Sequence, residues 1–182
     1  MQNYTQEYTY DELGNINQMK SVGDWTRDYY YETVNNRLKN HDNQTDVYDY
    51  DEHGNCTEMP HLPELAWDYK DELKEVTLDA SNNKAYYVYD AGGERVRKVV
   101  EKTGGIVEER FYIGGFEVYR KTVSGTLDYE RETLKISEGR NTIAQLETKT
   151  VENGNTISSL KFPQFSSQII DSWLSGILGL VL

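Results

Sequence analysis

Aromatic and polar residues alternate in short stretches along the first ninety positions of the chain. In Y-T-Y-D-E-L-G-N, the rings of Tyr8 and Tyr10 are separated by a single threonine. Side chains two positions apart leave the same face of a strand, so this alternation predicts β-strands with one aromatic face. The pattern recurs in Y-D-Y-D-E-H-G-N from Tyr48 and in Y-V-Y-D-A-G-G-E from Tyr87. The sequence therefore predicts a series of short, similar strands.

Each phrase carries a turn signal directly after its second tyrosine. Asp favours the first position of a type I turn, and Gly readily adopts the positive φ that follows. The chain then returns through a second short strand, which predicts a hairpin with a Gly-containing loop. The residues assigned to this repeat motif are Tyr8, Tyr10, Asp11, Gly14, Asn15, Tyr48, Tyr50, Asp51, Gly54, Asn55, Tyr87, Tyr89, Asp90 and Gly93.

Two weaker copies lie between the full phrases, Y-Y-Y-E at 29–32 and W-D-Y-K at 67–70. Their turns are expected at N-N-R-L (35–38) and K-D-E-L (70–73). A fixed step near twenty residues is typical of a repeat architecture. The steps are 21, 19, 19 and 20 residues when the second aromatic of each copy is aligned, which selects Tyr10, Tyr31, Tyr50, Tyr69 and Tyr89.

The predicted strands become longer after the third full phrase. They cover 95–100, 106–113, 116–123, 127–136 and 142–148, and most are separated by Gly-containing pairs. Asn153-Gly154 is a strong hairpin signal. No stretch of ten residues before residue 160 shows helical periodicity. We therefore predict that residues 1–160 form an all-β array of antiparallel hairpins in one extended sheet.

The tail, residues 161–182, has a different character. Its apolar run is shorter than the roughly 20 residues that span a bilayer, and it contains Asp171. We expect a short amphipathic helix without stable membrane insertion. The alternatives are a membrane role and an aberrant end of the reading frame. Ser166 or Ser167 could cap this helix, and its apolar positions are Ile169, Ile170, Trp173, Leu174, Ile177, Leu178, Val181 and Leu182.

Composition predicts a thin core and argues against two kinds of partner. The chain has 37% apolar residues, and it has 15 Tyr against 4 Phe. Tyrosine packs with its ring and hydrogen-bonds with its hydroxyl, which suits a sheet that faces water. The net charge of −12 disfavours nucleic acid and anionic membrane surfaces, because both attract clustered Lys and Arg. The first residues lack the basic and apolar regions of a cleavable signal.

Residues that carry catalytic or metal chemistry are sparse. His41, His53 and His61 lie near Cys56, but a second cysteine to complete a zinc set is lacking. A carboxylate pair of the glycosidase kind is another possibility, although the turn aspartates already have a structural role. The sequence contains no G-x-S-x-G, phosphate loop or G-x-G-x-x-G. We therefore expect no enzyme activity, catalytic residue, metal site or cofactor.

The phrase Y-x-Y-D-x-x-G-N resembles the YD repeat of Rhs and teneurin-type proteins. The block that follows contains, in order, Y-V-Y-D-A-G-G-E-R-V-R-K-V, E-R-F-Y-I-G-G-F-E-V-Y-R-K, L-D-Y-E-R-E-T-L-K-I and I-A-Q-L-E-T. It is similar to the Rhs-repeat region of the C component of bacterial tripartite insecticidal toxin complexes. The resemblance covers residues 4 to about 160. It implies a curved sheet that forms part of a hollow shell around a toxic C-terminal polypeptide.

The resemblance also implies partners and a location. The partners would be the remaining YD-repeat shell, or a shell-forming component, and the enclosed toxin. The location would be secreted or extracellular, within a larger toxin. The family's self-cleavage motif is built around Asp-Pro, whereas Pro60, Pro63 and Pro163 follow Met, Leu and Phe. We therefore expect a structural fragment of the shell without a cleavage site.

A surface-exposed module that binds carbohydrate or protein through its Tyr-rich face is the alternative function. Exposed aromatic rings flanked by acids suit the stacking of sugars. The two functions predict different positions for the tyrosine rings. An open row of rings would favour the binding module, and rings buried between neighbouring hairpins would favour the shell.

Overall fold

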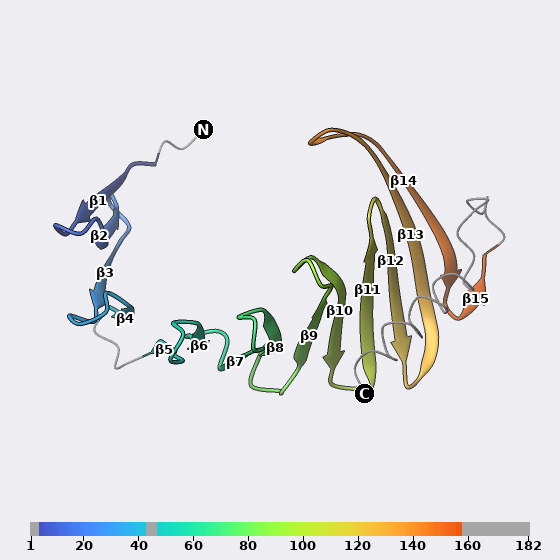
Figure 1. Ribbon diagram of the computed structural model, residues 1–182, viewed down its shortest axis with the longest axis horizontal. Helices are drawn as coiled ribbons and strands as arrows, with labels where there is room; N and C mark the ends of the chain where they lie inside the picture. Colours follow the sequence, from blue (N-terminus) through green and yellow to red (C-terminus); the bar gives the residue numbers. More distant parts are fainter. Residues whose placement is uncertain (1–3, 43–46, 158–182) are drawn as a thin grey trace. The chain divides into compact units, whose positions relative to one another are not determined.

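The computed structural model describes residues 4–42 and 47–157 (Figure 1). This part of the chain contains fifteen strands and no helix, so the all-β prediction is confirmed. The strand pairs are antiparallel, for example β1 with β2 and β12 with β13. The predicted helix of 161–182 lies outside the described residues. Within them, no helix is long and apolar enough to cross a membrane.

The chain divides into two compact units, Met1–Val107 and Glu108–Leu182. In the first unit, hydrogen-bonded neighbours follow the order of the sequence within three groups. The first group is β1 (Gln6–Tyr10), β2 (Ile16–Ser21), β3 (Trp25–Tyr31) and β4 (Leu38–His41). The second is β5 (Asp49–Tyr50) and β6 (Cys56–Glu58), and the third is β7 (Glu64–Trp67), β8 (Leu73–Thr77), β9 (Lys84–Tyr89) and β10 (Arg95–Lys102).

The expectation of one continuous sheet is therefore wrong for the first unit. Strand β5 has two residues, too few to continue a ladder from β4. The backbone N–H groups of Val47 and Tyr48 instead both donate to the carbonyl of Lys39, at 3.2 and 3.3 Å. Two donors that converge on one carbonyl join the hairpins without the regular alternation of a β-ladder.

An aromatic residue ends the first strand of each repeat hairpin. The strand register shifts at or next to this residue, as between Thr9 and Tyr10 and between Ala66 and Trp67. Such bulges increase the local twist and end the pairing before the turn. The aromatic residues in this position are Tyr10, Tyr31, Tyr50, Trp67 and Tyr89.

The fourth copy is therefore aligned on Trp67, and the alignment on Tyr69 is wrong. W-D-Y contains two aromatic residues, and only the one before Asp68 completes a strand. Tyr69 lies in the turn and is 85% exposed. The steps between equivalent aromatics become 21, 19, 17 and 22 residues.

Among its described residues, the second unit has four strands of 8 to 13 residues and one strand of two residues. They are β11 (Ile106–Ile113, of which the first two residues precede the unit boundary), β12 (Phe116–Val123), β13 (Thr126–Glu138), β14 (Asn141–Glu152) and β15 (Asn155–Thr156). The predicted strands 106–113 and 116–123 are confirmed, whereas β13 and β14 are longer than predicted. They pair as far as Glu138 and Asn141, because Gly139, with a φ of 58°, allows a tight turn between them.

The buried core is thin, as the composition predicts. In the second unit, Phe111, Phe116 and Val118 form its central cluster, and Ile113 and Leu134 pack against them. Among the described residues, the buried apolar side chains are Leu65, Val76, Ala85, Val96, Phe111, Phe116, Val118 and Val151. So few buried residues leave much of the stability to turns and to polar contacts between hairpins.

Candidate functional site

The repeat turns are closed by the aspartate that follows the aromatic residue. In the first copy, Oδ1 of Asp11 accepts hydrogen bonds from the backbone N–H groups of Leu13 and Asn15, at 2.9 and 2.8 Å. Its Oδ2 accepts from the side-chain amide of Asn15 at 2.7 Å. That last bond is the largest cause of the lowered pKa of Asp11. Gly14 has a φ of 89°, so the predicted left-handed position is observed.

The second and third full phrases build the same turn. Oδ1 of Asp51 accepts from the N–H groups of Gly54 and Asn55, both at 2.8 Å. Oδ1 of Asp90 accepts from those of Gly92 and Glu94, at 2.8 and 3.0 Å. Gly54 and Gly93 have φ values of 100° and 81°.

The variant turns use other residues for the same geometry. The fourth turn runs from Asp68 to Glu72 and so begins two residues earlier than expected, and Asp71 takes the positive φ of 62°. In the second copy, the N–H of Glu32 donates to the carbonyl of Arg37 and Asn36 has a φ of 61°. These residues replace glycine because Asn and Asp tolerate the left-handed region.

One turn of this kind was not predicted from the sequence. Between β8 and β9, Oδ1 of Asp79 accepts from the N–H groups of Ser81 and Asn83, at 2.9 and 3.2 Å. Asn82 takes the left-handed position with a φ of 59°. The signal was present as L-D-A-S-N-N, where Asn stands in place of Gly.

The aromatic residues that precede three of these turns donate to the preceding hairpin. The hydroxyl of Tyr31 donates to the carbonyl of Ile16 at 3.1 Å, and that of Tyr50 donates to the carbonyl of Leu38 at 2.9 Å. The indole N–H of Trp67 donates to the carbonyl of Cys56 at 2.8 Å. Burial raises the pKa of both tyrosine hydroxyls. These side chains therefore lie between neighbouring hairpins.

A second contact joins each of the first two full turns to the variant turn that follows. The side-chain amides of Asn15 and Asn36 exchange two hydrogen bonds, at 2.6 and 3.1 Å. In the same way, the amide of Asn55 donates to Asp71 at 2.8 Å. The partners, Asn36 and Asp71, are the residues that replace glycine in the variant copies. A variant turn therefore supplies the oxygen acceptor that a glycine turn lacks.

Side chains of the variant turns also lie close to the turn glycine of the next full copy. A Cβ on Gly54 would lie 3.1 Å from Nη2 of Arg37, and Nη1 of the same side chain donates to the carbonyl of Asp51 at 3.1 Å. A Cβ on Gly93 would lie 3.1 Å from a carboxylate oxygen of Glu72. Full and variant copies thus make different, complementary contacts.

The first tyrosines of the phrases have more varied surroundings. Tyr8 is exposed and its hydroxyl donates to Gln6 at 2.8 Å. The ring of Tyr48 lies 6.2 Å from that of His41, edge to face. Arg95 and Lys98 both lie 5.7 Å from the ring of Tyr87.

His41, His53 and Cys56 have separate partners. His41 contacts Asp42, and Nδ1 of His53 lies 2.7 Å from Asp71, which raises the pKa of His53. The thiol of Cys56 donates to the carbonyl of Glu58 at 3.1 Å, and burial raises its pKa, which favours the neutral thiol. Across residues 4–42 and 47–157, no group of three or more His, Cys, Asp or Glu side chains could hold a metal ion.

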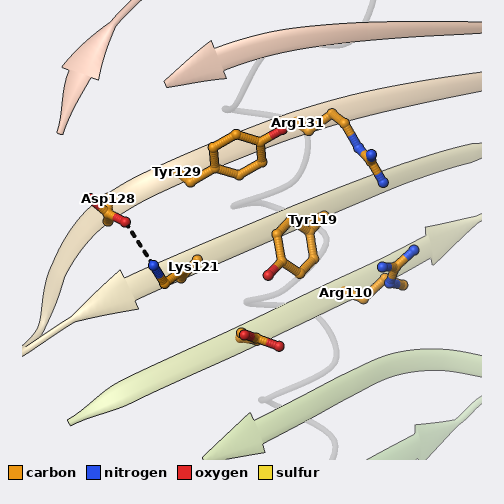
Figure 2. A pocket seen from close by; sticks show the side chains of 7 residues that line it. Arg110, Tyr119, Lys121, Asp128, Tyr129 and Arg131 are labelled. Atoms are coloured by element: carbon orange, nitrogen blue, oxygen red, sulfur yellow. Dashed lines mark hydrogen bonds and ion pairs between the residues drawn. The ribbon is translucent and has the colours of Figure 1, made fainter. Parts of the chain in front are cut away.

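A hollow of about 500 Å³ opens on one face of strands β11 to β13 (Figure 2). Two tyrosines on neighbouring strands, Tyr119 and Tyr129, lie among charged side chains. Sequence reasoning did not identify this site, because its residues become neighbours only through strand register. Its lining residues are Glu108, Arg110, Tyr119, Lys121, Asp128, Tyr129 and Arg131.

Comparison of the chain with models of known protein families and with curated proteins gives no match. The contacts between repeats and the hollow over β11–β13 are therefore the observations that bear on function.

The hydrogen bond from Tyr50 gives a direct test of the aligned register. Tyr50→Phe should lower the free energy of unfolding by about 1 kcal/mol, because the carbonyl of Leu38 loses its donor. Tyr69→Phe is the matched control, since Tyr69 is 85% exposed and should lose nothing measurable. Urea denaturation followed by circular dichroism would compare them, and a larger effect at Tyr69 would contradict the alignment on Trp67.

Proposed function

We propose that this chain is a structural segment of an Rhs-type YD-repeat shell, which encloses a toxic C-terminal polypeptide. The observation that carries the proposal is the position of the aromatic residues. Tyr31, Tyr50 and Trp67 each donate to a backbone carbonyl of the preceding hairpin. In three copies of the repeat, the aromatic side chain before the turn joins two hairpins and does not belong to a row of open rings.

The distribution of buried groups supports the same role. A shell wall faces water or polar cargo on both sides, so it needs contacts within the sheet more than a deep core. The buried apolar residues are few, and the turn aspartates and asparagines are engaged in hydrogen bonds within and between turns. In this role the chain acts by shape and has no catalytic step.

The proposal can be tested on the intact gene. We expect the DNA on either side of the coding region to encode further Y-x-Y-D-x-x-G-N repeats, followed by a polypeptide of a different type. When the repeats and this polypeptide are expressed together, trypsin should spare the polypeptide, and it should digest the same polypeptide expressed alone. Flanking DNA without repeats, or equal digestion in both samples, would contradict a shell function.

A surface-binding function remains the second candidate, and one observation favours it. The hollow over β11–β13 presents two tyrosine rings and several charged groups on one face of the sheet. These groups are not explained by contacts between repeats.

A further inference from the structure

Strand register places a ring opposite a cation twice in the hollow of Figure 2. Tyr119 on β12 is directly opposite Arg131 on β13, and Lys121 is directly opposite Tyr129. Residues directly opposite each other in an antiparallel pair share one face of the sheet. The two rings meet edge to face, with centroids 5.9 Å apart and an angle of 62°. The floor of the hollow is therefore a diagonal pair of rings flanked by a guanidinium and an ammonium group.

Arg131 is the weakly satisfied cation of this group. It contacts the carboxylate of Glu147, with 3.5 Å between Nη1 and Oε2. Its Nε is buried without a hydrogen-bond acceptor. On its other side, Arg131 is directly opposite Lys149 of β14, and like charges in this arrangement destabilise a sheet. An added anion at the terminal nitrogens of Arg131 would offset the repulsion between Arg131 and Lys149.

The other cations of the hollow are held by their own ion pairs. Arg110 pairs with Glu117 and lies 5.3 Å from the ring centroid of Tyr119. Lys121 pairs with Asp128 at 3.1 Å. These pairs fix the rim of the hollow and leave Arg131 as the principal anion acceptor. The chain carries a net charge of −12, but at physiological salt charges beyond about 8 Å are largely screened, so the local field is set by the lining groups, which include three cations and two carboxylates.

We propose that this hollow binds a sugar that carries a carboxylate group. The terminal nitrogens of Arg131 match the two oxygens of a carboxylate, which is the geometry that arginine recognises best. The rings of Tyr119 and Tyr129 provide apolar contact for the C–H groups of a sugar ring, and Lys121 and Asp128 line the same hollow and offer polar groups for hydroxyls. The volume of about 500 Å³ falls within the usual range for small-molecule sites.

The tyrosine rings distinguish this ligand from an acidic peptide. A glutamate side chain could reach Arg131, but it would leave both rings uncovered and would lose rotational freedom on binding. A sugar ring is already rigid and covers an aromatic surface as it places its carboxylate. The proposal does not depend on the shell function, since it concerns one face of the second unit alone.

The test uses the full chain and two oligosaccharides of equal length. Tetragalacturonate carries carboxylates, and a galactose tetramer is its neutral counterpart. Saturation-transfer NMR would report contact between sugar C–H groups and protein, and calorimetric titration would give the affinity. We expect the acidic tetramer to bind at least about tenfold more tightly than the neutral one, because a charge-assisted contact is added.

The variants separate the site from general charge attraction. Arg131→Gln should weaken binding of the acidic tetramer by at least about tenfold, because the carboxylate contact is lost. Arg140→Gln removes the same charge at the exposed β13–β14 turn and should leave binding unchanged. Arg131→Lys keeps the charge but lacks the planar fork, and should give an intermediate affinity. Circular dichroism would establish that each variant is folded.

Four outcomes would overturn the proposal. The first is that the acidic tetramer does not bind at about 10 mM, a concentration above the dissociation constants of functional sites. The second is that the neutral tetramer binds equally well, and the third is that Arg131→Gln and Arg140→Gln weaken binding equally. The fourth is that hexaglutamate binds as tightly as the acidic tetramer. The last would reassign the hollow to acidic peptides.

Discussion

Replacing Phe111 with alanine should lower the free energy of unfolding by about 3–5 kcal/mol, the usual cost of truncating a buried phenylalanine. Phe111 is 2% exposed and packs in a cluster with Phe116 and Val118, which are 2% and 0% exposed. A thin sheet has little surrounding material that can collapse into the resulting cavity. Because small domains are stable by only about 5–15 kcal/mol, this single change should remove a large share of the total.

Ile143→Ala is the matched control for this prediction. Ile143 belongs to the same unit but is 63% exposed, so its truncation should change stability by less than about 0.5 kcal/mol. Urea titrations followed by circular dichroism would give both values. Similar midpoints for the two variants would show that the Phe111 cluster is not the main core of this unit.

Replacing Gly54 with valine should destabilise the first unit by about 2–3 kcal/mol, since a β-branched residue strongly resists positive φ. Gly54 has a φ of 100°, and a Cβ there would lie 3.1 Å from the guanidinium of Arg37. Arg37 would have to move, and it would weaken its hydrogen bond to the carbonyl of Asp51 and its contact with the ring of Tyr50, 5.3 Å away.

Gly14→Val separates backbone strain from this side-chain contact. Gly14 also has a positive φ, 89°, but no atom lies within 4 Å of the position of its Cβ. Its substitution should therefore be milder than that of Gly54 by about 1 kcal/mol, the size of one hydrogen bond. Chemical denaturation would test the difference. Equal effects would argue against the role of Arg37, and no effect at either position would remove the turn assignment.

The hairpins were predictable because their signals are local. Asp11, Gly14 and their counterparts close a turn within five residues, so alternation and turn chemistry locate them without knowledge of the fold. The longer strands 106–113 and 116–123 were predictable for the same reason. The extent of β13 and β14 was not, because each pairs beyond its apolar residues along a partner that only the fold supplies.

The remaining errors concern choices that depend on three-dimensional neighbours. Tyr69 and Trp67 are both aromatic and lie two positions apart. Only the position of the preceding hairpin shows that Trp67 is the residue that donates to the carbonyl of Cys56. The division of the first unit into separate sheets depends on the carbonyl of Lys39, which accepts hydrogen bonds from the N–H groups of both Val47 and Tyr48. The hollow combines residues from three strands, so neither its rings nor Arg131 are marked in the linear sequence.

The alternation of full and variant turns has a consequence for how such a gene can grow or shrink. Asp11, Asp51 and Asp90 are 40 and 39 residues apart, so two hairpins, not one, make up the period of the array. Loss of a single hairpin would place Asn15 before Gly54, which has no side chain to accept its amide, and would remove Arg37 altogether. Loss of a pair again places a full turn before a variant turn, so Asn15 would meet Asp71, which supplies an oxygen acceptor. Insertions and deletions inherited by relatives of this chain should therefore come in steps of about forty residues, a spacing fixed by the chemistry of the turns.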